Sequence, residues 1–362
     1  MTDRIRIGLI GTSGYAKLML HTLVNHADAE FAAICGRTRS RATELAAEYQ
    51  IEQLFTDYHD MIKHGRLDGI MVAAPDDLHF EMTMAALDAG LHVLCEKPMA
   101  TNIEQAQQML EAAEQAGVKH MIEFSWRWMP HYQYLHQLVA DGFVGRGYHC
   151  HYRFLSNSAR HRDYAWRIDP RRSLGVLGDL GSHMVDLALW ISGDIRSVSA
   201  NLAAFSAWTD TAGQPFTGAN ESALLAVEFA DGAQGMIHVS TVAHLAARRR
   251  EQFVTLHGEG GSLEVEWRVF GGAEKGLALR GCRQNDEDFQ VLPIPDKYLQ
   301  GVEVGEVIQV FRQHLVGPRL FVDAIRHDYQ PTPSFAQGLK VQQVLEAALV
   351  SHLTGQRVPI DG

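Results

Sequence analysis

The interpretation of the chain begins with Ile5-Arg6-Ile7-Gly8-Leu9-Ile10-Gly11-Thr12-Ser13-Gly14-Tyr15-Ala16. Residues 5–10 form an apolar run with the length of a buried strand, 11–14 have the composition of a turn, and 15–25 predict a helix. A glycine turn between a first strand and a first helix is where the pyrophosphate of a dinucleotide docks on a helix N-terminus. The stretch therefore predicts a nucleotide site.

The glycine pattern G-x-G-x-x-G/A is incomplete in this turn. Gly11 and Ala16 occupy its first and third places, and Ser13 stands at the second. A small serine still allows the backbone to approach a phosphate, and Gly14 can share that role. Such a turn is often only a turn, but its N-terminal place in a strand–helix–strand context favours cofactor binding. The predicted contacts are Gly11, Thr12, Ser13, Gly14 and Tyr15.

Predicted strands and helices alternate up to about residue 123, and after that the predicted elements are mostly strands. Strands are predicted at 31–35, 70–74, 92–95 and 119–123, with helices at 39–49, 80–89 and 104–115. This alternation indicates a parallel, doubly wound α/β sheet. Later strands at 148–155, 197–205, 222–229, 234–242, 251–257, 261–267 and 276–279 follow one another through short turns. They predict a mostly antiparallel sheet with helices at 181–191 and 335–354, and hence two domains, 1–123 and 124–362.

Composition excludes several classes of protein. The 362 residues carry 32 Lys and Arg against 43 Asp and Glu, so the formal net charge of −11 disfavours nucleic-acid binding. No apolar run reaches the ~18–20 residues needed to cross a bilayer, and the N-terminus lacks signal-peptide character. Four cysteines, Cys35, Cys95, Cys150 and Cys282, are scattered without metal-ligand spacing. We expect a cytoplasmic protein with no membrane partner, no nucleic-acid partner and no metal site.

The end of the second strand bears on the choice of cofactor. An NAD enzyme usually places Asp or Glu there for the ribose 2′-hydroxyl. Here the strand ends in Gly36-Arg37-Thr38-Arg39-Ser40-Arg41, without a carboxylate. Arg37 can pair with a 2′-phosphate or stack on adenine, which favours NADP over NAD. The alternative is a solvated basic loop at the start of a helix.

Specific sequence motifs lie in three further stretches: 68–79, 85–98 with its Glu96-Lys97-Pro98 ending, and 175–186 with Asp179-x-x-x-His183. Together they resemble the Gfo/Idh/MocA family over nearly the whole chain. The resemblance implies a Rossmann domain followed by a substrate-binding and oligomerisation domain with a large open sheet. It also implies hydride transfer between NAD(P) and a hydroxyl or carbonyl carbon of a sugar, cyclitol or polyol, by a homodimer or homotetramer. A cis Lys97–Pro98 bond is part of the same expectation.

The resemblance assigns catalysis to Lys97, Asp179 and His183. Lys97 follows a strand at the carboxyl end of the parallel sheet, where open α/β sheets bind ligands. Asp179 and His183 are four residues apart, so both project from one face if a helix begins by Asp179. His183 would be the general base, Lys97 would polarise the reacting oxygen, and Asp179 would orient the substrate or the imidazole. Asp186, one turn further on, is interpreted as structural or supporting.

The remaining candidates surround these residues in the sequence. Pro75, Asp76 and His79 lie just past a strand end and are expected to flank the nicotinamide. The other expected cofactor contacts are Ala74, Glu96 and Lys97. Arg127, Trp166 and Arg167 are expected to bind substrate, because aromatic faces and guanidinium groups suit a polyhydroxylated ring. Packing between domains is the alternative for these side chains. Two other functions stay open: a glycosidase that uses nicotinamide transiently, and a non-catalytic dinucleotide-binding regulator.

Overall fold

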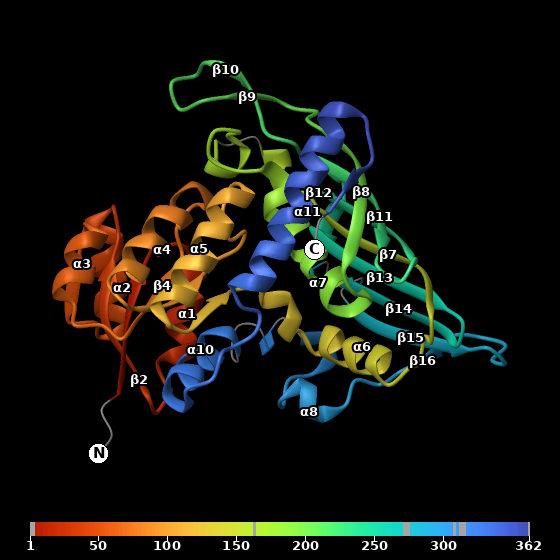
Figure 1. Ribbon diagram of the computed structural model, residues 1–362, viewed down its shortest axis with the longest axis horizontal. Coiled ribbons are helices and arrows are strands. Elements are labelled where there is room, and N and C mark those ends of the chain that lie inside the picture. The colour runs from red at the N-terminus through yellow and green to blue at the C-terminus, as the bar shows by residue number, and fades with distance from the viewer. Residues whose placement is uncertain (1–3, 162–163, 271–275, 307–308, 311–315, 361–362) are drawn as a thin grey trace. The chain divides into compact units, whose positions relative to one another are not determined.

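The computed structural model of the chain describes residues 4–161, 164–270, 276–306, 309–310 and 316–360 (Figure 1). It contains two compact units, one of Met1–Ser125 with Phe311–Gln342 and one of Trp126–Val310 with Gln343–Gly362. The sequence predicts a single division after residue 123. The structure differs because the chain returns to the first unit, where Phe321 is fully buried and lies 3.3 Å from the position a Cβ would take on Gly69.

The first unit is built on a six-stranded parallel sheet in the order β3-β2-β1-β4-β5-β6. Its strands are β1 (Ile5–Ile10), β2 (Ala29–Cys35), β3 (Gln53–Phe55), β4 (Gly69–Val72), β5 (His92–Cys95) and β6 (His120–Ile122). This order confirms the predicted Rossmann sheet. The direction of winding reverses between β1 and β4, and the carboxyl ends of all six strands lie at one edge.

Helices cover the first unit's sheet. They are α1 (Gly14–Leu23), α2 (Arg39–Tyr49), α3 (Tyr58–His64), α4 (His79–Asp88), α5 (Ile103–Ala116) and α10 (Val316–His327). Helix α1 packs against α2 and α10, whereas α4 packs against α3 and α5. The sequence analysis does not predict β3 or α3. Strand β3 is only three residues long, and α3 buries a single residue, Met61, so neither leaves a clear hydrophobic period.

The second unit contains a nine-stranded sheet in the order β16-β15-β14-β13-β7-β12-β11-β8-β17 (Figure 1). Its strands are β7 (Gly147–Ser156), β8 (Ile195–Ala203), β11 (Ser222–Phe229), β12 (Gln234–Ser240), β13 (Arg250–Gly258), β14 (Gly261–Arg268), β15 (Gly276–Arg283), β16 (Gln290–Val291) and β17 (Val358–Pro359). The mostly antiparallel prediction is confirmed. The exception is β7 with β12, which are parallel because a long connection through α7 separates them.

Alternation along the strands places one face of this sheet on a core. In β7, Cys150, Tyr152 and Phe154 are buried, whereas His149 and His151 are exposed. The buried face carries α7 (Ser182–Ser192), which packs against α6 (Pro130–Ala140). The unit also contains α8 (Asp296–Leu299) and the β9–β10 hairpin (Ala207–Thr209, Pro215–Thr217). Helix α11 (Phe335–Thr354) has the bounds that the sequence predicts, and the boundary between the units falls inside it.

Short helical turns complete the described chain. A π-helical turn covers Leu177–Gly181, and 3₁₀ turns cover Asp76–Leu78, Ser125–Trp128, Ser158–His161, Trp166–Ile168, Ala246–Arg248 and Val304–Glu306. Among the described helices, none combines the length and apolar character that crossing a membrane requires. The four cysteines form no disulfide.

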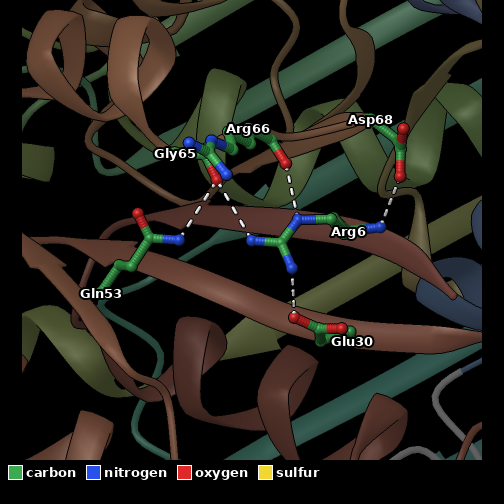
Figure 2. A network of polar contacts seen from close by, with 6 residues as sticks. All are labelled: Arg6, Glu30, Gln53, Gly65, Arg66 and Asp68. Carbon is green, nitrogen blue, oxygen red and sulfur yellow. Dashed lines mark hydrogen bonds and ion pairs between the residues drawn. The ribbon is translucent and has the colours of Figure 1, made fainter.

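Arg6 joins several segments at the amino end of the Rossmann strands (Figure 2). From β1, its Nε donates to the carbonyl of Arg66 at 2.7 Å and its Nη1 to Glu30 on β2 at 2.6 Å. Its backbone N–H donates to Asp68 at 2.7 Å, and its Nη2 reaches the carbonyl of Gly65 at 3.4 Å. Gln53 on β3 donates to the same Gly65 carbonyl. One side chain therefore ties β1 and β2 to the loop before β4.

We expect Arg6→Ala to lower the free energy of unfolding by about 1 kcal/mol, because three side-chain hydrogen bonds disappear from a partly exposed site. Urea unfolding of the purified protein measures this. Arg4→Ala is the matched control, since Arg4 makes a single hydrogen bond, at 3.3 Å to the carbonyl of His26. Equal losses in the two variants would contradict the role given to Arg6.

Candidate active site

The glycine turn lies between β1 and α1 and leaves no room for a side chain at Gly11. Gly11 has φ +127°, and a Cβ there would lie 2.3 Å from the carbonyl oxygen of Ala73. At Gly14 a Cβ would meet nothing within 4 Å, so the start of the helix is open. Ser13 is the N-cap of α1, its hydroxyl accepting from the N–H of Ala16 at 3.2 Å. This capping role explains a serine at the second place of the pattern.

The turn has the properties of an anion site. The first turn of α1 contains no acidic residue, and its N-terminus carries the positive end of the helix dipole. Thr12 packs against Gly36, where a Cβ would lie 2.5 Å from the Thr12 Cγ2. Tyr15 is 37% exposed. The residues that are present therefore fit the pyrophosphate of a dinucleotide.

Beyond β2 the chain presents an exposed basic loop. Cys35 and Gly36 are buried, and Arg37, Arg39 and Arg41 are exposed. This arrangement leaves the Arg37 guanidinium accessible at the carboxyl edge of the sheet. It agrees with a site for a phosphate on the adenosine ribose and equally with a solvated loop.

His79 braces two loops at the same edge of the sheet. Its imidazole is fully buried, with Nδ1 2.7 Å from the carbonyl oxygen of Pro98 and Nε2 3.0 Å from that of Ala74. Burial lowers the pKa of His79, although the two carbonyls oppose that shift. Both ring nitrogens thus face the backbone, and Pro75 begins the short 3₁₀ turn between these loops. His79 is placed to hold the loop after β4 against the loop after β5.

Glu96 and Lys97 follow β5 and are unusually buried for charged residues. Glu96 is 9% and Lys97 8% exposed, and the Lys97 N–H donates to the Glu96 carboxylate at 3.2 Å. The cis Lys97–Pro98 bond expected from the resemblance is confirmed. Glu123, directly after β6, is 2% exposed. Sequence reasoning includes Glu123 in a strand and misses it as a candidate, although a glutamate after Met121-Ile122 is a signal that could have been used.

In the second unit, Asp179 and His183 lie on different kinds of helical turn. Asp179 belongs to the π-helical turn Leu177–Gly181, and His183 is the second residue of α7. Helix α7 agrees with the predicted helix over 181–191 to within one residue, and Asp179 precedes it on the π-helical turn. At the entry of that turn, Gly175 has φ +64° and the side chain of Asn220 accepts from the N–H of Leu177 at 3.0 Å. No sequence signal identifies Asn220 as this anchor.

Asp179 meets one of the predicted substrate residues. The Arg167 Nε donates to the Asp179 carboxylate at 3.3 Å, and the Arg167 guanidinium lies 4.2 Å from the centre of the Trp166 ring. Both charged side chains are partly exposed, at 39% and 23%. The structure thus brings Asp179, Arg167 and Trp166 together. A polar group bound there would meet an acceptor, a donor and an aromatic face.

His183 lies against an aromatic cluster. Its ring packs edge-on to Trp126 at 5.5 Å and 70°, and His183 is 5% exposed. Trp126 makes similar edge contacts with Phe154 at 5.9 Å and Trp267 at 5.3 Å. Trp126 is therefore packed among three aromatic rings of the second unit. These contacts also fix the plane of the His183 imidazole from one side.

Arg127 forms a buried ion pair with Asp186. Its Nε donates to Asp186 Oδ2 at 2.8 Å and its Nη2 to Asp186 Oδ1 at 2.6 Å, and Asp186 is 1% exposed. Trp190 lies 5.4 Å from the same guanidinium. Two donors of Arg127, predicted to bind substrate, are thus engaged inside the unit. Asp186 has the supporting role expected of it.

The Arg127–Asp186 pair predicts a large effect on stability. Asp186→Asn is expected to lower the free energy of unfolding by about 3–5 kcal/mol, because it leaves the guanidinium buried without its counter-charge. Urea unfolding followed by tryptophan fluorescence measures the loss. Arg196→Ala, at an ion pair in which Arg196 is 60% exposed, is the control and is expected to change stability by at most about 1 kcal/mol. A small effect of Asp186→Asn would show that the pair is unimportant.

Within the described ranges, no group of three or more His, Cys, Asp or Glu side chains is arranged to hold a metal ion. The candidate site residues form one group in each unit. In the first unit they are the Gly11 turn, Arg37 and the ends of β4, β5 and β6. In the second they are the turn containing Asp179 and the start of α7.

Comparison with known proteins gives two family matches. A model of the GFO_IDH_MocA oxidoreductase family, described as an NAD-binding Rossmann fold, matches residues 5–124. A model of the GFO/IDH/MocA C-terminal domain matches residues 132–264. The two matched segments correspond to the Rossmann sheet and to most of the nine-stranded sheet.

Individual relatives are similar at low identity. Levoglucosan dehydrogenase of Pseudarthrobacter phenanthrenivorans is 24% identical, over 86% of this chain and 84% of its own. The scyllo-inositol 2-dehydrogenase (NADP(+)) IolU of Bacillus subtilis is 30% identical, over 58% of this chain and 65% of its own. A solved structure of levoglucosan dehydrogenase in complex with NADH has a TM-score of 0.87 at 22% identity, covering 99% of this chain and 100% of that one. That likeness establishes a shared fold.

Proposed function

The chain belongs to the GFO/IDH/MocA family of oxidoreductases, and on that premise we propose that it transfers a hydride between NAD(P) and a CH–OH carbon of a sugar, cyclitol or related polyol. The observation that carries the proposal is the buried Glu96-Lys97-Pro98 turn at the carboxyl end of β5. This turn lies at the same edge of the Rossmann sheet as the Gly11 turn, where open α/β sheets bind their ligands.

The cofactor would be held by the first unit. Gly11 and Gly14 leave the backbone open at the start of α1, and the N–H groups there would receive the pyrophosphate. Ala74, Pro75 and Glu96 follow β4 and β5, in the half of the sheet that takes the second mononucleotide. When bound, the nicotinamide supplies the hydride acceptor or donor, and the protein supplies orientation and proton transfer.

The first unit's contribution to proton transfer would come from Lys97. Its ammonium, held on a largely buried turn, donates a hydrogen bond to the reacting oxygen and stabilises negative charge that develops on it. The His79 Nδ1 contacts the carbonyl oxygen of Pro98 and so holds this turn in place. The position of Lys97 therefore depends on the buried His79.

His183 and Asp179 would act from the second unit. The imidazole of His183 would accept the hydroxyl proton during oxidation and return it during reduction. Trp126 fixes the orientation of its ring. Asp179, with Arg167 and Trp166 beside it, orients the substrate hydroxyls. The two relatives named for levoglucosan and scyllo-inositol support a polyhydroxylated ring as the substrate class.

The first test separates chemistry from cofactor binding. Lys97→Ala and His183→Ala are each expected to lower kcat by about 10²–10⁴-fold. The dissociation constant of the reduced cofactor, followed by its fluorescence, is expected to change little. Turnover is measured by nicotinamide absorbance over a panel of sugars, inositols and sugar acids. Near-normal turnover in both variants would overturn the assignment, and hydrolysis without net absorbance change would indicate a glycosidase.

We infer a preference for NADP over NAD from the exposed Arg37 and the absence of a carboxylate at the end of β2. Arg37→Ala is expected to raise the dissociation constant for NADP by about 10–100-fold, because a hydrogen bond to a charged phosphate is lost, and to leave that for NAD unchanged. Arg4→Ala, at the amino end of β1, is the control. Tighter binding of NAD than NADP by the unaltered protein would contradict the inference.

We also infer a homodimer or homotetramer that associates through the outer face of the nine-stranded sheet. On that face Leu224 of β11 is 43% and Met236 of β12 42% exposed. Both alternate with buried neighbours on their strands, so they point away from α7. Exposed apolar side chains in adjacent strands favour a protein partner.

A further inference from the structure

Glu123 is the most unusual buried group in the first unit. It follows β6 directly and is 2% exposed. Within the described part of the chain, neither of its carboxylate oxygens has a hydrogen-bond partner. Its backbone is firmly held, because its N–H donates to the carbonyl of Cys95 at 2.9 Å. A buried carboxyl group without a partner is costly and calls for a functional explanation.

The charged groups around Glu123 come from few elements. Strand β5 contributes Cys95, followed by Glu96 and Lys97. On the other side, the N–H of Ile122 donates to the carbonyl of Pro333 at 2.9 Å. The other titratable groups nearby are His120, on β6 itself, and the buried Asp76 after β4, whose charge acts on the Cys95 thiol.

Most of these groups carry no charge that would hold Glu123 ionised. Burial lowers the pKa of His120 to about 4, so its ring is neutral at pH 7, and burial raises the pKa of the Cys95 thiol. Burial also raises the pKa of Glu123 well above its usual range, and the charge of Glu96 raises it further. Burial to 2% exposure without a hydrogen-bond partner for either oxygen favours the neutral acid form of Glu123 over the carboxylate.

The position of Glu123 after β6 suggests when this carboxyl group would release its proton. Strands β4, β5 and β6 form the second half of the Rossmann sheet, which receives the nicotinamide mononucleotide. Glu123 directly follows the third of these strands, as Glu96 directly follows the second. An oxidised nicotinamide ring carries a positive charge that the reduced ring lacks. In a water-poor site, a positive charge favours an ionised carboxylate at close range.

We propose that Glu123 senses the redox state of the nicotinamide: it releases its proton to solvent when the oxidised cofactor binds and keeps it when the reduced cofactor binds. The proposal rests on the proposed cofactor site and adds a residue to it. Each cycle releases and takes up one proton. When the oxidised cofactor binds, protonated Glu123 releases its proton to solvent and the carboxylate pairs with the cationic ring. When the ring is neutral, the carboxylate takes a proton back from solvent. The proton of the substrate hydroxyl is separate and goes to His183.

The test uses the ratio of two dissociation constants, oxidised over reduced, for the same cofactor between about pH 6 and about pH 9. Taking the ratio cancels the titration of a 2′-phosphate, which both forms carry. Because binding of the oxidised form releases a proton, its affinity rises with pH, and the ratio is expected to fall by up to about tenfold per pH unit. In Glu123→Gln the ratio is expected to be independent of pH.

A second measurement needs no variant. Titration calorimetry in buffers of different ionisation enthalpy counts the protons exchanged. Binding of the oxidised cofactor is expected to release up to one proton near neutral pH, and binding of the reduced cofactor none.

Glu123→Gln is expected to keep its melting temperature, since it replaces one neutral group by another of similar shape. Glu30→Gln, at the amino end of β2, is the matched control and is expected to keep the pH dependence.

The outcomes separate this inference from the proposed function. Binding of neither cofactor form would reject the proposed function itself. Binding of both forms with a flat ratio and no proton release would overturn the role of Glu123 alone. In Glu96→Gln the pH dependence is expected to persist but to move to lower pH, because one neighbouring negative charge is gone. Loss of the dependence in Glu96→Gln together with its retention in Glu123→Gln would assign the titration to Glu96 and reject the proposal.

Discussion

The close approach of Gly11 to Ala73 is the constraint on which the first unit depends. Strands β1 and β4 are neighbours, and the winding of the sheet reverses between them. The loop after β1 must therefore pass over the end of β4, and a Cβ at Gly11 would lie 2.3 Å from the Ala73 carbonyl oxygen. With no side chain there, α1 begins directly above the reversal point, and its N-terminus opens on the edge where β4, β5 and β6 end.

Within each unit, charged and polar side chains next to the candidate site residues contact other protein groups. His79 connects two loops, Arg127 and Asp186 connect the 3₁₀ turn Ser125–Trp128 to α7, and Asn220 holds the entry of the π-helical turn. Each is buried or partly buried and bonded to a specific neighbour. Such contacts are expensive to break, so they give Lys97, His183 and Asp179 defined positions. Preorganisation of this kind is what proton transfer requires.

The sequence allows prediction of the elements with a strong period and of residues carried by the family motifs. The bounds of β1, α2, β5 and α11 agree with prediction because apolar spacing and flanking glycine or proline residues define them. The parallel pairing of β7 with β12 could not be predicted, since pairing across a long connection leaves no local signal in the sequence. The π-helical turn at Asp179 depends on the distant Asn220. Side-chain partners leave no local signal in the sequence: Asp186 beside Arg127, and the carbonyls of Ala74 and Pro98 beside His79, lie in distant segments or in the turns of other elements.

Charge at the carboxyl edge raises a conflict that protonation resolves. A dinucleotide is anionic, and the chain as a whole carries a net charge of −11. The start of α1, Arg37 and Lys97 bring positive potential to this edge, whereas Glu96 and Glu123 bring two carboxyl groups to it. Two ionised carboxylates so close together in a water-poor place would repel each other and the phosphates. One proton on Glu123 removes the repulsion between the two carboxylates before the oxidised cofactor binds, and its release restores a negative charge when a cationic ring is there to be balanced. A glutamate at this position can be neutral without the cofactor and negatively charged beside the oxidised ring. A glutamine could not, because it never ionises. An aspartate is shorter by one methylene and would reach less far.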